Sequence, residues 1–240
     1  MSLVVTVYSR EGIVMAADSR LTLTYQRTTP GQAPHTVSVT SSDSAKKLFL
    51  TSDRIGISAF GVAAVNGAPI AGVIESFIVE HLKGKALPPK ETGEALLAYF
   101  GNVGVSQDSS FHIAGYRPTG NSLAQEVVFA RLADGTVKKL NATGQPGANW
   151  GGEIDVFQRL INDVALVGAG GAASTPIPNF GVPFQFFTLQ DAIDFASYAM
   201  RATIDTMRFQ AREKTVGGPV DILVITPDDA RWIAQKQLGV

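Results

Sequence analysis

The chain has 240 residues, of which 45% are hydrophobic and 17% are charged, and its formal net charge is −1. This balance gives no indication of nucleic acid or an anionic membrane surface as a partner. The lack of cysteine excludes disulfides, thiolate catalysis and cysteine-ligated zinc. No apolar run reaches the roughly 20 residues of a membrane-spanning helix, and no signal peptide is visible. We therefore expect a single domain over residues 1–240, located in the cytoplasm, with no metal, no cofactor and no membrane partner.

Strands dominate the expected structure up to residue 60. Two apolar runs rich in β-branched residues, 3–8 and 13–17, flank a four-residue turn and predict a β-hairpin. Two helices should follow, because apolar residues recur at helical spacing over 70–82 and a shorter helical segment covers 91–100. Between the first hairpin and these two helices, we expect four further strands, at 21–25, 35–39, 47–50 and 55–60.

The second half of the chain repeats this order of strands and helices. Thr188 can cap a long helix over 189–212, and residues 168–183 are rich in Gly and Pro and predict a long loop. Grouped strands and grouped helices favour an α+β fold, in which two sheets are each covered by a helix pair. The remaining expected elements are strands at 111–116, 126–132, 136–140 and 220–226, and helices at 154–164 and 228–238.

Several motifs resemble known functional sites, but their positions in the predicted elements disfavour those functions. Residues 167–173 fit a G-x-G-x-x-A phosphate-binding turn, but they follow a helix rather than the first strand of a βαβ unit. Ser58 lies within a strand and not at a nucleophile elbow, so a hydrolase triad through it is disfavoured. His81 lies on the apolar face of a helix, which is typical of a packed core histidine. Trp150 stands in a Gly-rich loop, where packing is favoured over a role as a substrate platform.

Ser2 offers a nucleophile and a base on one residue. A small residue after Met1 permits removal of the initiator methionine, and Ser2 would then carry a hydroxyl and a free α-amine. Such an amine has a pKa of about 7.7–8.0. It can therefore act as a general base for its own hydroxyl near neutral pH. Because Met-Ser starts are common, this signal alone favours no function.

Five segments of the chain resemble one known family of proteins, and the first of them contains Ser2. Residues 2–20 (SLVVTVYSREGIVMAADSR), 45–49 (AKKLF) and 55–61 (IGISAFG) resemble proteasome β-subunits and their bacterial relatives. The first segment carries the turn glycine and the A-A-D-x-R end of that family, and the second resembles its catalytic lysine segment. Residues 113–116 (IAGY) and 217–222 (GGPVDI) resemble two later strands of the family. The likeness is close over about residues 2–84 and looser beyond.

This resemblance implies a four-layer αββα sandwich of the N-terminal nucleophile hydrolase type. Ser2 falls on the nucleophile, Lys47 on the catalytic lysine and Asp18 on the acid that holds this lysine charged. Gly61 falls on the glycine whose N–H helps to form the oxyanion hole. Glu213 stands where the family has an acid that supports the α-amine. The implied activity is proteasome-like cleavage of peptide bonds by a homo-oligomeric ring.

The chain also departs from that family. Val216 replaces a supporting serine and cannot donate a hydrogen bond, and the segments 26–44 and 168–183 are unlike a standard β-subunit. While Met1 remains, the nitrogen of Ser2 is an amide and cannot serve as the base. Two alternatives stay open: a non-peptidase hydrolase of small amides on the same fold, and a catalytically silent ring or scaffold subunit.

Overall fold

The computed structural model describes residues 2–28, 33–65, 67–104, 108–171 and 174–237. These residues form a mixed α+β fold built on two five-stranded antiparallel sheets. Within the described residues, no helix is long and apolar enough to cross a membrane.

The first sheet contains both ends of the described chain. Its strand order is β12-β1-β2-β15-β16, so the N-terminal hairpin forms its centre together with β15. Successive residues of β1 alternate between the two faces: Leu3, Val5 and Val7 pack toward helices, whereas Val4 packs toward the other sheet. The strands are β1 (Leu3–Tyr8), β2 (Ile13–Ala17), β12 (Gly147–Gly152), β15 (Asp221–Ile225) and β16 (Ala230–Ala234).

The second sheet packs against the first through a shared apolar core. Its strand order is β11-β10-β9-β6-β5. Residues of both sheets, among them Met15, Leu48, Ala114 and Leu223, form a buried cluster between them. The strands are β5 (Leu48–Leu50), β6 (Gly56–Gly61), β9 (Ser109–Thr119), β10 (Ser122–Arg131) and β11 (Thr136–Lys139).

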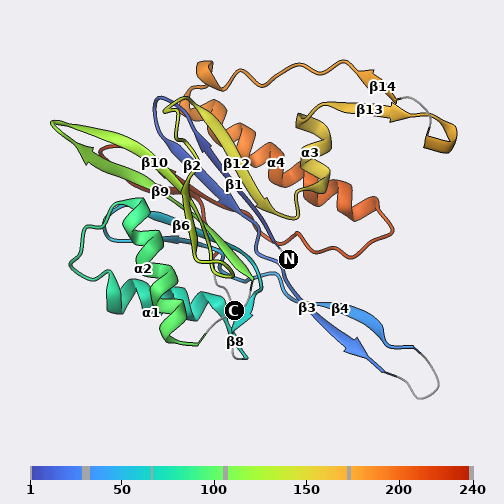
Figure 1. Ribbon diagram of the computed structural model, residues 1–240, viewed down its shortest axis with the longest axis horizontal. Coiled ribbons are helices and arrows are strands. Elements are labelled where there is room, and N and C mark those ends of the chain that lie inside the picture. Colours follow the sequence, from blue (N-terminus) through green and yellow to red (C-terminus); the bar gives the residue numbers. More distant parts are fainter. Residues whose placement is uncertain (1, 29–32, 66, 105–107, 172–173, 238–240) are drawn as a thin grey trace.

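Helices cover the outer face of each sheet (Figure 1). The helices α3 (Asp155–Ile161) and α4 (Leu189–Phe209) share a buried cluster with β1, β2 and β15. Helix α4 begins at a capping box in which Thr188 and Asp191 bond reciprocally, and its alanines face the sheet. On the other side, α1 (Ile70–His81) and α2 (Pro89–Asn102) share a cluster with β6 and β9.

Two antiparallel hairpins extend from this body. One consists of β3 (Leu21–Arg27) and β4 (His35–Ser42), which projects away from the sheets in Figure 1. The other consists of β13 (Val164–Val167) and β14 (Ser174–Ile177). A short pair, β7 (Ala64–Val65) and β8 (Ala68–Pro69), leads into α1.

The sequence-based prediction of secondary structure was wrong in three places, and the helix expected over 154–164 ends at Ile161, before the unexpected strand β13. The expected helix over 228–238 is the edge strand β16, in which alternate residues are half-buried. Trp150 lies in strand β12 rather than in a loop, although it packs as expected, edge-to-face on Phe157. The expected loop over 168–183 contains β14. Each strand is established by pairing with a segment distant in sequence or across a Gly-rich turn, which local patterns do not show.

Candidate active site

A buried carboxylate organises the start of the chain. Asp18 follows strand β2, and its side chain has no exposed surface. Its Oδ1 accepts hydrogen bonds from Leu3 N (3.0 Å) and Lys47 Nζ (2.8 Å). Its Oδ2 accepts bonds from the backbone N–H groups of Arg20 and Gly217, both at 3.1 Å. Four donors from four segments thus replace the water that a buried carboxylate loses.

Lys47 lies just before β5 and is held on two sides. Besides its ion pair with Asp18, its Nζ donates to the carbonyl oxygen of Arg20 at 2.6 Å. An ammonium has three N–H donors, so these two bonds orient it without using all of them. Burial lowers the pKa of Lys47; Asp18 and Asp43 oppose this decrease, and the positive charge of Lys236 adds to it.

Ser2 lies next to this ion pair at the beginning of β1. The residue is buried, and its carbonyl oxygen accepts a hydrogen bond from Glu153 N at 2.7 Å. Because Asp18 binds the N–H of Leu3, it fixes the backbone that follows Ser2. Ser2 and Lys47 line one cavity, of about 340 Å³. Ser2 and Gly61 line a second cavity, of about 350 Å³. Met1 lies outside the described residues.

Gly61 ends strand β6 in a conformation that requires glycine. Its φ is +102°, and a Cβ there would lie 2.4 Å from the carbonyl oxygen of Asp108. Gly152 is similarly constrained, since a Cβ would lie 1.8 Å from the carbonyl oxygen of Ser2. Gly61 thus allows the end of β6 to approach the backbone at Asp108, and Gly152 allows β12 to approach Ser2.

Among the described residues, no hydrogen bond links Glu213, the acid expected to support the α-amine, to Ser2. Glu213 is exposed, and the part of the chain that the structure describes shows no ion pair or hydrogen bond of its carboxylate. Glu153, whose N–H binds the Ser2 carbonyl oxygen, has a carboxylate held by Arg212 (2.5 Å) and Thr215 (3.1 Å). Glu153 was not among the residues predicted from the sequence. Its position directly after Gly151 and Gly152 was the available signal.

The cavity shared by Ser2 and Lys47 is mainly apolar. It lies between the base of the β3–β4 hairpin, the end of β6 and the first turn of α1. Lys46 also lines it and forms a 2.8 Å ion pair with Glu75. The apolar side chains lining it are Leu21, Ala45, Ala59, Phe60, Val62, Ala63, Pro69, Ile70 and Ala71.

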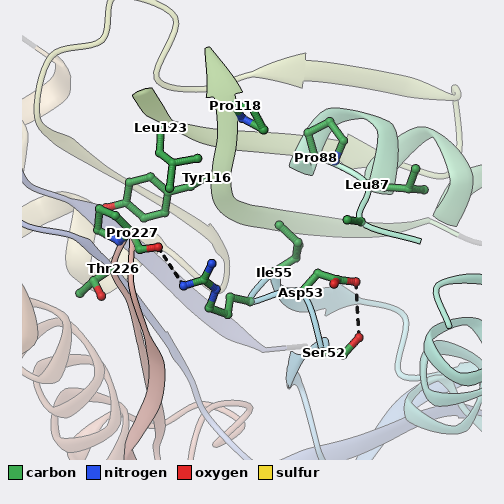
Figure 2. Close-up of a pocket in the computed structure, with 12 residues that line it drawn as sticks. Ser52, Asp53, Ile55, Leu87, Pro88, Tyr116, Pro118, Leu123, Thr226 and Pro227 are labelled. Carbon is green, nitrogen blue, oxygen red and sulfur yellow. Dashed lines mark hydrogen bonds between the residues drawn. The ribbon is translucent and has the colours of Figure 1, made fainter. Parts of the chain in front are cut away.

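A separate cavity of about 320 Å³ lies at the opposite end of strand β6 (Figure 2). Tyr116, Leu123 and Pro118 form one wall, and the β5–β6 turn forms another. Arg54 in this turn donates to the carbonyl oxygen of Pro227 at 2.8 Å. Neither Ser2 nor any other predicted catalytic residue lines this cavity.

The structure does not place the other candidate residues and motifs, His81, Ser58 and the Gly-rich segment, in arrangements that suit catalysis. His81 is exposed on α1, contrary to the expected core position. The buried histidine is His112, whose Nδ1 lies 3.1 Å from Thr6 Oγ1 between the sheets. Ser58 is buried in β6. The Gly-rich segment at Gly168 to Gly171 connects β13 and β14 in a hairpin, so it is not the turn of a βαβ unit. In comparisons with known proteins, no family model and no curated sequence matches this chain.

Proposed function

We propose that this chain is an N-terminal nucleophile hydrolase that cleaves amide bonds, on a four-layer αββα sandwich with Ser2 as nucleophile. The observation that carries the proposal is one chain of contacts. Asp18 Oδ1 binds both Lys47 Nζ and the N–H of Leu3, and Ser2 and Lys47 line the same cavity. The packing of the two sheets between α1–α2 and α3–α4 supports the fold.

The reaction begins once Met1 has been removed. The Ser2 α-amine accepts the proton of the Ser2 hydroxyl, directly or through a water, while Oγ attacks the amide carbonyl carbon. The charge of Lys47 lowers the energy of the developing alkoxide. The N–H of Gly61 donates to the oxyanion of the tetrahedral intermediate, a contribution of roughly 3 kcal/mol. The intermediate expels the amine, which takes the proton from the α-ammonium and leaves an ester on Ser2. Water then hydrolyses the ester.

The surrounding residues keep these groups in place. Asp18 holds Lys47 charged and, through Leu3, fixes the strand that carries the nucleophile. Glu153 anchors the residue that carries the nucleophile, because its backbone N–H binds the carbonyl oxygen of Ser2. Arg212 and Thr215 bind its carboxylate and so hold this residue in place.

The substrate is a peptide or a small amide with an uncharged apolar group next to the scissile carbonyl. The cavity beside Ser2 supports this choice, since its walls are alanine, leucine, isoleucine, valine and phenylalanine side chains. A positively charged group would lose its hydration there and would lie beside Lys46 and Lys47, which carry the same charge.

We also propose that the protein works as a homo-oligomeric ring. A two-stranded hairpin is marginally stable by itself in water. In the β3–β4 hairpin, Leu23 lies opposite Val39 and Tyr25 opposite Val37, which gives it one apolar face. Leu23, Tyr25 and Val39 are exposed in the single chain. Light scattering should therefore find a multiple of 25.4 kDa. A single-chain mass at micromolar concentration would contradict the ring.

The hydrolase proposal is tested with protein that begins at Ser2, prepared behind a cleavable ubiquitin. A panel of fluorogenic amides with apolar acyl groups should be hydrolysed by this protein and not by the Ser2→Ala variant. The Lys90→Ala variant is a control, because the Lys90 side chain is exposed on α2 and pairs with Glu94 of the same helix. Equal turnover by the wild type and Ser2→Ala would refute the proposal.

A further inference from the structure

A second buried ion pair lies close to the pair formed by Asp18 and Lys47. Asp221, the first residue of β15, accepts a hydrogen bond at Oδ1 from the backbone N–H of Lys236 at 2.8 Å. The ammonium of Lys236 bonds to the other oxygen, Oδ2. The two side chains are 3% and 10% exposed, so both charges are largely removed from water. Asp221 belongs to the segment 217–222 that resembles a late strand of the family, whereas no motif in the sequence singled out Lys236.

The fold attaches both ion pairs to the same backbone. In the register of β15 and β2, Asp221 lies opposite Ala17, the residue directly before Asp18. The segment that enters β15 begins at Gly217, whose N–H donates to Asp18 Oδ2. Lys236 arrives from the other side, two residues after the edge strand β16 ends. The last described residues of the chain therefore bring an ammonium close to the candidate active site.

Stability does not explain this pair. The cost of removing two charges from water largely cancels their attraction, and apolar residues of similar size often stabilise as well or better. The pair has an electrostatic consequence, however, because several charges in a poorly hydrated region act on the pKa of Lys47. Asp18 and Asp43 favour its charged form, and Lys236 disfavours it. Arg20 contributes only its carbonyl oxygen to the ammonium of Lys47.

We propose that Lys236 is a positioning residue of this site: its ammonium, held by Asp221, acts through Lys47 and makes Lys47 a stronger hydrogen-bond donor to the reacting oxygen of Ser2. A like charge nearby makes the N–H groups of Lys47 more acidic, and a more acidic donor binds a developing alkoxide more strongly. The catalytic part of this inference rests on the proposed function, whereas the charge coupling between the two lysines does not.

The experiment follows the Lys47 ammonium by NMR titration of protein labelled at lysine, with the signal assigned through Lys47→Arg. Lys236→Met should raise the pKa of Lys47 toward its ordinary value. Lys236→Arg keeps the charge and should restore the wild-type titration. Arg231→Met is the matched control, because it removes an exposed charge from the adjacent strand β16 and should change nothing.

Activity provides the second readout. Lys236→Met should move the alkaline limb of the pH–activity profile to higher pH and should lower turnover near neutral pH, because Lys47 becomes a weaker hydrogen-bond donor. Lys236→Met leaves the Asp221 carboxylate buried without its partner, and this variant can fail to fold. In that case the double variant Asp221→Asn, Lys236→Met removes both charges, and it should shift the pH–activity profile in the same direction by a smaller amount.

An unchanged Lys47 titration in folded Lys236→Met protein would overturn the inference. A shifted titration with an unchanged pH–activity profile would also overturn it, because Lys236 would then not act on the reaction. If the wild type hydrolyses nothing, the proposed function fails instead. The NMR titration would still show whether the two lysines are coupled.

Discussion

Asp18 and Lys47 form a buried ion pair with a 2.8 Å contact, and the Asp18 oxygen in this pair also accepts the N–H of Leu3 at 3.0 Å. One carboxylate oxygen therefore joins the cation of the candidate site to the strand that carries Ser2. A change at either residue should affect both the position of the nucleophile and the charge beside it.

Substituting this pair should abolish turnover and lower stability by different amounts. Asp18→Asn should cost about 3–5 kcal/mol of unfolding free energy, because it leaves the Lys47 ammonium buried without its counter-charge. Lys47→Met should cost less, since Asp18 keeps three backbone N–H donors. Urea unfolding gives the stability, and fluorogenic amide hydrolysis gives the activity. Wild-type turnover in either variant would exclude the proposed site.

Filling the apolar cavity should change specificity without removing activity. Ala71 lines the cavity from α1. Ala71→Leu should lower kcat/KM for amides with a bulky apolar group by roughly tenfold or more, and should spare those with a small one. Gly72→Ala is a control on the same helix, because a Cβ at Gly72 meets nothing within 4 Å. Uniform losses for all substrates would place the bound group elsewhere.

His112 should make the fold sensitive to acid. Burial lowers its pKa from 6.5 to about 4. Between these two pH values the unfolded chain binds more protons at this site than the folded chain, so stability is lost as the pH falls through the interval. The loss amounts to about 3 kcal/mol for a shift from 6.5 to about 4.

Substitution of His112 tests this directly by urea unfolding across the interval. His112→Gln can still bond Thr6, and it should remove the acid-dependent loss even if it lowers stability at neutral pH. His81→Gln changes an exposed histidine instead and should leave the wild-type pH dependence intact. The same pH dependence in His112→Gln would assign the acid sensitivity to other groups.

Local patterns predicted most of this fold, and long-range pairing explains where they failed. The hairpin of β1 and β2 and the amphipathic helix α4 are encoded by nearby residues, so the sequence was sufficient. Strand β12 is rich in glycine and forms a strand because it pairs with β1. Residues 228–238 have no strong local preference for a strand; β16 forms by pairing with the buried strand β15.

The candidate site shows the same division. Asp18, Lys47 and Gly61 were predicted because their spacing from Ser2 follows the pattern of one family. Glu153 and Lys236 could not be predicted that way, because only the folded chain places them near residues far away in sequence. Glu153 reaches Ser2 through the pairing of β12 with β1. Lys236 is linked to the strand that precedes Asp18 through its bonds to Asp221 and the pairing of β15 with β2.

The central claim is that the free α-amine of Ser2 activates its own hydroxyl. It is tested most directly by treating Met1-bearing and Met1-free protein with a hydroxyl-directed electrophile, such as an epoxyketone or a β-lactone. Mass spectrometry then gives the labelled residue and its fraction. We predict that only Met1-free protein is labelled, at Ser2, in proportion to the fraction that has lost Met1. Equal labelling of the two forms would contradict the mechanism.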